Sequence, residues 1–219
     1  MCGRYALASS PIEIARHFNL HSWETFDAGY NIAPGSLIPV IRQSPENQRV
    51  LHRLTWGLLP HWAKDPTIAA RLNNARGESV SDKPAFRDAF SRRRCLIPAS
   101  GFFEWKTEGK LKQPFYISLR SGEPMALGGL WESWRSPDRS ILRTACIVTV
   151  GPNAVMAPIH DRMPVILRPD TWQDWLSAPA ADILPLVATC PAALLQAWPV
   201  DRRVNKTAEN DPDLIRPLP

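Results

Sequence analysis

The sequence of 219 residues lacks any apolar run long enough to span a membrane. It also lacks a secretory pattern, because Arg4 and Glu13 interrupt the apolar residues near the N-terminus. No Gly/Ser-rich stretch or run of charge divides it, and no internal repeat or low-complexity segment is present. We therefore expect a single domain over residues 1–219 and a cytoplasmic location.

Cysteine and metal-binding patterns are also scarce. The four cysteines are scattered without a C-x-x-C pair, at Cys2, Cys95, Cys146 and Cys190. This spacing argues against a disulfide framework and a zinc site, and the last three, next to apolar residues, are expected to be buried hydrophobes. The histidines form no H-E-x-x-H pattern, and neither a Gly-rich phosphate loop nor a G-x-S-x-G elbow is present. We expect no metal and no cofactor.

The features that are present favour a polyanionic partner. Lys and Arg total 26 against 21 Asp and Glu, and the sequence pI is near 9.3. Arginine outnumbers lysine, which suits bidentate phosphate recognition. Trp62, in the segment 57–62 (Gly-Leu-Leu-Pro-His-Trp), could stack on a nucleobase, since aromatic side chains are sequence-tolerant platforms for single strands.

Periodicity and turn residues predict many short strands and a few short helices. The 22 prolines argue against long helices. A capping box over 10–13 (Ser-Pro-Ile-Glu) predicts a helix to about Asn19, and further helices are expected over about 84–91 and after Asp170 as cap. Strands are expected at 37–41, 49–56, 95–99, 102–106, 115–119, 125–134, 142–150 and 165–167. The fold class is therefore α+β on mostly antiparallel or mixed sheet, with a loose C-terminal tail over about 207–219.

Cys2 would become the first residue if the initiator Met1 were removed. It would then carry a thiol and an α-amine, which titrate near roughly 8.5 and 8, so both are usable nucleophiles at neutral pH. Such an aminothiol can attack an acyl carbon, or capture an aldehyde as an imine and close a thiazolidine. The alternative is an ordinary second residue.

Glu104 stands among aromatic residues, in the segment 101–105 (Gly-Phe-Phe-Glu-Trp) of a predicted strand. Alternation places Phe102 and Glu104 on one face, with Phe103 and Trp105 on the other. A carboxyl group beside apolar walls has a raised pKa, which suits a proton shuttle near neutral pH. The alternative is a solvent-facing Glu on an edge strand.

Three further polar residues are candidates for chemistry or binding. His160 lies in the segment 159–164 (Ile-His-Asp-Arg-Met-Pro), a rigid turn entering a strand, where functional residues concentrate. Asn74 and Arg76 lie in a polar loop or strand end, and offer an amide that can hold a nucleophile and a fork that can hold phosphate. A structural His and a hydrogen-bonded loop are the alternatives.

Six segments, in order along nearly the whole chain, together resemble the SRAP family of SOS-response-associated peptidase, or abasic-site processing, proteins. They are 1–5 (Met-Cys-Gly-Arg-Tyr), 30–35 (Tyr-Asn-Ile-Ala-Pro-Gly), 56–62 (Trp-Gly-Leu-Leu-Pro-His-Trp), 74–78 (Asn-Ala-Arg-Gly-Glu), 95–105 (Cys-Leu-Ile-Pro-Ala-Ser-Gly-Phe-Phe-Glu-Trp) and 159–164. The resemblance implies a single α+β SRAP domain that crosslinks to abasic sites through Cys2. Asn74, Glu104 and His160 fall on the family's active-site positions.

The resemblance also implies a partner and its contacts. The expected partner is single-stranded DNA containing abasic sites, bound by a monomer that needs no membrane and no metal and is nucleoid-associated through DNA. Arg4, Arg76 and Arg162 fall on positions expected near the DNA backbone. The residue after Trp62 is often aromatic in the family and helps to wedge bases apart, whereas here it is Ala63. The wedge would then rest on Pro34 and Trp62, the remaining DNA-binding positions.

The mechanism that follows is a hypothesis. The α-amine of Cys2 attacks the aldehyde of an opened abasic site, Glu104 shuttles protons, and the thiol closes the ring, while Asn74 holds the Cys2 backbone and His160 acts as acid or base at the sugar oxygen. An imine that persists allows β-elimination, hence weak lyase activity. Met1 leaves by aminopeptidase action or self-processing.

Two other functions fit parts of the same sequence. An N-terminal-nucleophile amidohydrolase or peptidase would use the Cys2 thiolate on an amide, with its α-amine as base. A nucleic-acid-binding module without chemistry would leave the N-terminal Cys and Glu104 unexplained.

Overall fold

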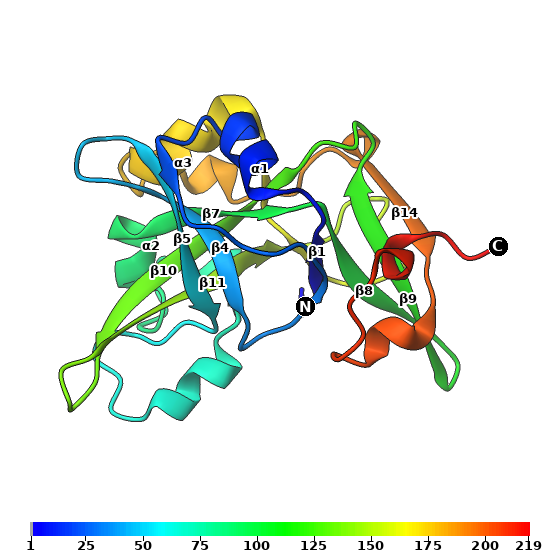
Figure 1. The fold of residues 1–219 in the computed structure, drawn as a ribbon, viewed down its shortest axis with the longest axis horizontal. Helices are drawn as coiled ribbons and strands as arrows, with labels where there is room; N and C mark the ends of the chain where they lie inside the picture. The colour runs from blue at the N-terminus through cyan, green and yellow to red at the C-terminus, as the bar shows by residue number, and fades with distance from the viewer. Residues whose placement is uncertain (1) are drawn as a thin grey trace.

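Two β-sheets dominate the computed structural model (Figure 1). The structure describes residues 2–219. Met1, and with it the prediction that Met1 is removed, lies outside the described residues. The smaller sheet has the order β14 (Leu195–Pro199), β9 (Leu111–Leu119), β8 (Gly101–Glu108), β1 (Tyr5–Leu7) and β3 (Gly29–Ile32). The larger has the order β12 (Met163–Pro164), β11 (Ile141–Val150), β10 (Met125–Arg135), β7 (Arg94–Ala99), β4 (Leu37–Gln43), β5 (Arg49–Trp56) and β2 (Ser22–Trp23). In addition, β6 (Asn74–Arg76) pairs with β11, and β13 (Ile166–Leu167) pairs with β10.

A parallel pairing between β5 and β11 closes part of the larger sheet into a barrel. It joins Thr55 to Thr144 and Trp56 to Ala145, so that β11, β10, β7, β4 and β5 form a ring. Beyond this contact, β6 occupies the same side of β11, where Asn74 pairs with Ile147. The barrel wall therefore fixes the position of Asn74.

The strands predicted from the sequence lie close to their expected positions. β5 coincides with the expected range, and both predicted hairpins form, β8 with β9 and β10 with β11. The strand expected over 165–167 is instead the two short strands β12 and β13, on either side of Val165. The polar segment around Asn74 is a short strand.

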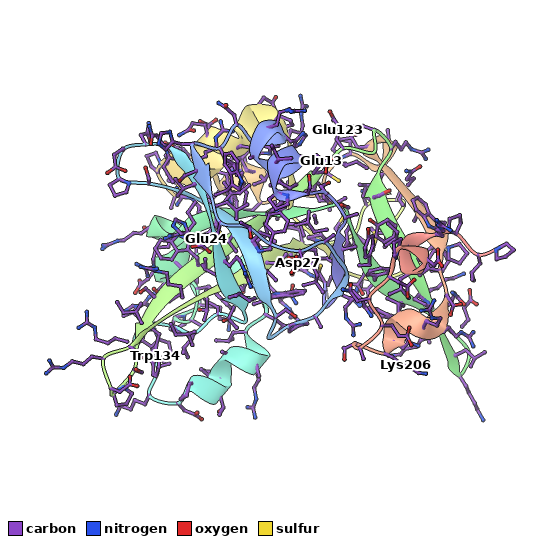
Figure 2. All side chains as sticks on the ribbon, viewed as in Figure 1. Glu13, Glu24, Asp27, Glu123, Trp134 and Lys206 are labelled. Atoms are coloured by element: carbon purple, nitrogen blue, oxygen red, sulfur yellow. The ribbon has the colours of Figure 1, made fainter. Side chains whose placement is uncertain are left out.

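Three short α-helices pack on the sheets: α1 (Pro11–His17), α2 (Arg87–Arg92) and α3 (Trp172–Ser177). The capping box of α1 is present, since Ser10 and Glu13 bond to each other's backbone amides. Glu13, in the first turn of α1, is labelled in Figure 2. The expected cap of α3 is wrong. Asp170 lies inside a 3₁₀ turn (Pro169–Thr171), where its carboxylate pairs with Arg168, and Thr171 precedes the helix.

The loose C-terminal tail is also a wrong prediction. Residues 207–219 include a 3₁₀ helix (Pro212–Ile215) whose Leu214 is fully buried. The carbonyl of Ile215 accepts a hydrogen bond of 3.0 Å from the indole of Trp198, and the amide of Leu218 donates to Pro199. These contacts, together with hydrogen bonds of Glu209 and Asn210 to β3, hold the tail on the smaller sheet, and none of them shows in the sequence as a periodic pattern.

The observed strands and few short helices confirm the α+β class. Between residues 2 and 219 we find no helix with the length and apolar character that crossing a bilayer requires.

Candidate active site

Glu104 is buried at the centre of the smaller sheet. Its strand β8 has β1 on one side and β9 on the other, and the residue is only 2 % exposed. The alternative of a solvent-facing Glu on an edge strand is therefore wrong. Burial raises the pKa of the Glu104 carboxyl above its usual value, and nearby His160 opposes that shift. The carboxyl group can thus hold a proton at a pH where an exposed Glu has lost it.

His160 faces this carboxylate from the segment that follows β11. Its Nε2 lies 3.7 Å from Oε2 of Glu104. The amide of Arg162 donates a hydrogen bond of 3.0 Å to Nδ1, which also lies 3.1 Å from Oδ1 of Asp161. Nδ1 thus has both a donor and an acceptor next to it, and a neutral ring that accepts the amide hydrogen at Nδ1 carries its proton on Nε2, the nitrogen nearer to Glu104.

Asn74 holds the N-terminal segment from the barrel side. Its Nδ2 donates a hydrogen bond of 2.8 Å to the main-chain carbonyl of Cys2. The other end of the amide, Oδ1, is buried and has no hydrogen-bond partner among residues 2–219. A buried acceptor in this state is costly unless a further group bonds to it. Asn74 can therefore accept one more donor close to Cys2.

Cys2 is fully buried. Burial raises the pKa of its thiol well above the ordinary value, and the negative charge of Glu104 adds to the shift. The sulfur is thus a neutral thiol at neutral pH, with a proton acceptor nearby. The structure brings together all four expected residues: Cys2, Asn74, Glu104 and His160.

The three arginines expected at the DNA backbone differ in their exposure and in the groups that their guanidinium groups contact. Arg76 is exposed at the end of β6. Arg162 instead makes a two-pronged ion pair with Glu78, at 2.5 and 2.9 Å, and bonds to the carbonyl of Thr149 at 2.6 Å. Arg4 donates to Oδ1 of Asn31 at 2.6 Å. Of these three residues, only Arg76 is exposed, whereas Arg4 and Arg162 are half-buried.

Pro34 and Trp62 are both exposed, as a wedge between bases would need. Ala63 is not on that surface. It is 8 % exposed, packs in a small cluster with Leu59 and Trp134, and its carbonyl accepts a hydrogen bond of 2.7 Å from the indole of Trp134. The position after Trp62, where the resemblance led us to expect an aromatic residue, is thus buried in this chain.

The role of Asn31 was not predicted from the sequence, although Asn31 lies in the segment 30–35, one of the six that resemble the SRAP family. Its buried side-chain amide donates to the carbonyls of Val204, Lys206 and Glu209, while its oxygen accepts from Arg4. It thereby joins the N-terminal strand region to the C-terminal segment. An Asn between Tyr30 and Ile32 in a strand was an available signal, because Asn is disfavoured in strands.

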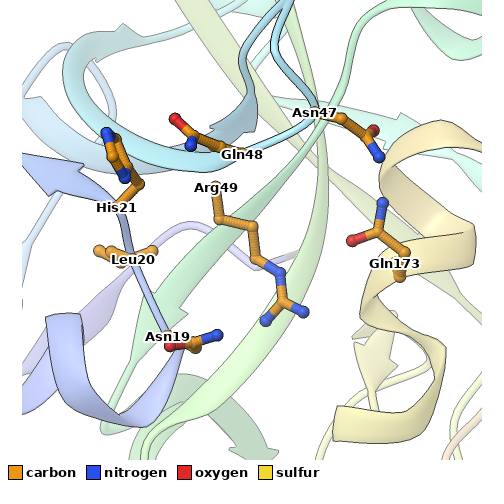
Figure 3. A pocket seen from close by; sticks show the side chains of 7 residues that line it. All are labelled: Asn19, Leu20, His21, Asn47, Gln48, Arg49 and Gln173. Carbon is orange, nitrogen blue, oxygen red and sulfur yellow. The ribbon is translucent and has the colours of Figure 1, made fainter.

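A separate polar hollow lies between the end of α1, the turn after β4 and α3 (Figure 3). It is lined by Asn19, Leu20, His21, Asn47, Gln48, Arg49 and Gln173, none of which was expected at the site. Across residues 2–219, no group of three or more His, Cys, Asp or Glu is placed to hold a metal ion.

Comparison with known proteins identifies the family. A family model described as SOS response associated peptidase (SRAP) matches residues 1–207. The chain belongs to the SRAP family. This confirms the resemblance noted in the sequence and explains why the six segments occur together.

Two relatives of this SRAP chain are the abasic site processing proteins YoqW and YoaM of Bacillus subtilis (strain 168). YoqW is 39 % identical, over 98 % of this chain and 99 % of its own length, and YoaM is 38 % identical, over 98 % and 97 %. A crystal structure of a protein from Bacteroides thetaiotaomicron has the same fold, with a TM-score of 0.90 at 24 % identity over 99 % of this chain and 100 % of that chain.

Proposed function

We propose that this SRAP protein binds abasic sites in single-stranded DNA and crosslinks to them as a thiazolidine through Cys2. The convergence of Asn74, Glu104 and His160 on the N-terminal segment carries the proposal. The names of YoqW and YoaM support abasic DNA as the substrate. Such a crosslink would shield the site during the response to DNA damage.

The first step is imine formation. An abasic site is in equilibrium with an opened sugar that has an aldehyde at C1′. Once Met1 is gone, the neutral α-amine of Cys2 attacks this carbon and gives a carbinolamine. Loss of water leaves the imine, and the raised pKa of Glu104 supports its role as the acid that protonates the departing hydroxyl.

The second step is ring closure by the thiol. The sulfur of Cys2 bonds to the imine carbon, and the S–H proton moves to the nitrogen, with Glu104 as the relay. The aldehyde and the aminothiol thus give a thiazolidine and one water. Sulfur and carbon are already joined in one intermediate, so closure has the advantage of an intramolecular step.

Asn74 and His160 have supporting roles. Asn74 holds the Cys2 carbonyl, and its second amide atom is available to the α-amine or the opened sugar. His160 exchanges a proton with the sugar oxygen during ring opening and reversal. If the imine lasts, loss of the 3′ phosphate by β-elimination gives weak lyase activity.

A thiolate peptidase is the second candidate, because the family description names a peptidase. It would need the Cys2 sulfur as a thiolate. Burial and the neighbouring Glu104 both favour the neutral thiol. This favours attack by the amine first. The two candidates also differ in stoichiometry, since a peptidase turns over whereas a crosslinker stops at one equivalent.

The test is to incubate the purified protein with a single-stranded oligonucleotide carrying one abasic site and to look for a shifted band after heating in denaturant. Intact mass must first show that Met1 is absent. An oligonucleotide with a tetrahydrofuran abasic analogue is the matched control, because it has the same shape but no aldehyde. We expect the band with the aldehyde substrate alone.

Two variants of Cys2 separate the steps. Cys2→Ser keeps the amine and should give an adduct only when borohydride reduces the imine. Cys2→Ala should likewise form no heat-stable adduct without borohydride. A heat-stable crosslink formed by Cys2→Ala without reduction would refute the thiazolidine.

A further inference from the structure

Trp62 is an exposed aromatic residue between two anchored neighbours. It is 50 % exposed, a large apolar area for one side chain. The carbonyl of Ala63, on one side, accepts a hydrogen bond of 2.7 Å from Trp134. On the other side, Nδ1 of His61 lies 3.1 Å from Oε2 of Glu132. Trp62 thus has little freedom at its backbone although its ring is exposed to solvent.

The anchors form one patch on the β10–β11 hairpin. Glu132 and Trp134 lie on the same face of β10, two residues apart, and Thr144 is paired directly opposite Glu132 on β11. The hydroxyl of Thr144 accepts a hydrogen bond of 2.8 Å from the amide of Leu59. Trp134 lies on β10 near the hairpin end (Figure 2). The segment 59–63 is therefore held at three points on a rigid surface.

Glu132 is the unusual member of this patch, since it is a carboxylate with 3 % exposure. Its charge is met by the guanidinium of Arg93 at 2.9 Å, by His61, and by the amide of Ser133 at 3.0 Å. A buried carboxylate is stable only when its oxygens are paired in this way. It therefore fixes the ring of His61 more firmly than an exposed partner would.

We propose that His61 and Glu132 are positioning residues that hold Trp62 ready to stack on a base beside the lesion. The inference rests on the proposed binding of single-stranded DNA. Stacking on an aromatic ring contributes to binding only after the ring has been ordered. A ring whose backbone is fixed in advance loses less freedom on binding, so the anchors act on affinity through Trp62 and not through a contact of their own.

A double-mutant cycle on non-covalent binding tests this. The probe is an oligonucleotide with the tetrahydrofuran analogue, which cannot crosslink, and the readout is Kd. We expect Trp62→Ala to weaken binding by about tenfold, from the usual contribution of one stacked base. His61→Ala should weaken it by roughly threefold, the usual scale for ordering one side chain. In the Trp62→Ala background, His61→Ala should have no further effect.

Two further variants keep the test independent of folding. His61→Asn retains an N–H donor near Nδ1 and should restore most of the affinity. Thr144→Val breaks the third anchor with little change of volume, and its loss of affinity should also vanish when Trp62 is Ala. His21→Ala, in the hollow of Figure 3, is the matched control and should bind as wild type. Melting temperatures identify any variant that is merely unfolded.

The outcomes separate the inference from the proposed function. If wild type neither binds the analogue nor crosslinks to abasic DNA, the proposed function fails. If wild type does both, but the losses for His61→Ala and Trp62→Ala simply add, the positioning role is refuted. An unchanged Kd for His61→Ala refutes it as well.

Discussion

Nδ2 of Asn74 donates a 2.8 Å hydrogen bond to the carbonyl of Cys2, and so connects the barrel to the residue proposed as nucleophile. The two residues are far apart in sequence, but β6 lies on β11 while the N-terminal segment leads into β1. The reactive end of the chain is thus held by a rigid wall rather than by its own neighbours. In the proposed reaction this bond places the α-amine in reach of the aldehyde.

Replacing Asn74 by Ala should slow crosslinking about five- to thirtyfold, from the loss of one partly buried hydrogen bond and of the buried acceptor beside it. The rate is measured from crosslinked bands over time. The Kd for the tetrahydrofuran analogue should change much less, because Asn74 acts on the reacting end and not on phosphates. The neighbouring Asn73→Ala is a matched control. Equal rates for Asn74→Ala and wild type would contradict the assigned role.

Replacing Glu104 by Gln should abolish rapid crosslinking and also stabilise the protein above acidic pH. Burial raises the pKa of Glu104 above the unfolded value of 4.5, so the folded state keeps a proton that the unfolded chain releases. The free energy of unfolding therefore falls as pH rises from the unfolded pKa through the folded pKa. A Gln side chain does not titrate, so Glu104→Gln does not lose stability in this way as pH rises.

The measurement is the melting temperature of both proteins at about pH 4 and about pH 8. The melting temperature of Glu104→Gln should be higher than that of wild type at the higher pH. The difference between the two melting temperatures should be smaller at the lower pH. Glu78→Gln is a control for which we expect the opposite change in stability. The hydrogen bond from Arg162 lowers the pKa of Glu78, so its contribution is present at neutral pH and is lost as pH falls. Glu78→Gln should therefore melt below wild type near neutrality. If Glu104→Gln melts below wild type at both pH values, the buried carboxylate of Glu104 does not destabilise the folded protein as we expect.

Arg76 and Arg162 should respond differently to substitution. Arg76 is exposed, so Arg76→Gln should weaken DNA binding and lower the slope of log Kobs against log salt by about 0.7, as loss of one phosphate contact on a single strand requires. Arg162 already holds Glu78 and the Thr149 carbonyl, so Arg162→Gln should lower the melting temperature as well. Exposed Arg168, which pairs with Asp170, provides the control substitution. A steeper salt dependence in Arg76→Gln than in wild type would contradict the phosphate contact.

Local patterns in the sequence predicted the strands β4, β5 and β7 to β11, the hairpins and the capping box, because each depends on residues within a few positions of one another. They did not predict the shorter strands β1, β3 and β14 of the smaller sheet. They did not predict barrel closure, which depends on a parallel contact of Trp56 with Ala145, 89 positions later in the numbering. Asp170 failed as a cap because the chain forms a 3₁₀ turn ahead of α3. Propensity alone does not distinguish these two geometries.

In the active site too, local sequence patterns predicted some features, while others depend on contacts that the sequence does not reveal. The alternation around Glu104 predicted its apolar environment, and the raised pKa agrees with it. The hydrogen bond from the Arg162 amide to Nδ1 of His160, which helps to orient the ring, has no sequence signal because the backbone supplies it. The tail was expected to be loose because the C-terminal third is Pro-rich and shows no legible pattern, whereas the hydrogen bond between Ile215 and Trp198 is a tertiary contact.

Leu214 tests the packing of that tail. Leu214→Ala should lower the free energy of unfolding by about 2 to 5 kcal/mol, the usual range for a buried leucine. The value comes from urea unfolding monitored by tryptophan fluorescence. Leu218→Ala is the matched control, since Leu218 is exposed and its anchoring contact is a backbone hydrogen bond that survives the change. Equal stability of the two variants would mean that the tail contributes nothing to the fold.

Ala63→Phe should not restore an aromatic wedge. Ala63 packs against Leu59 and Trp134, so a phenyl ring at this position would have to enter a filled space or displace the segment 59–63. Overpacking of this kind costs about 1 to 3 kcal/mol, and we expect a lower melting temperature with unchanged or weaker DNA binding. Kd for the tetrahydrofuran analogue and the melting temperature measure the two effects, with Ala63→Ser as the control of nearly equal size. A variant that bound DNA more tightly at unchanged stability would show that residue 63 can reach the surface beside Trp62.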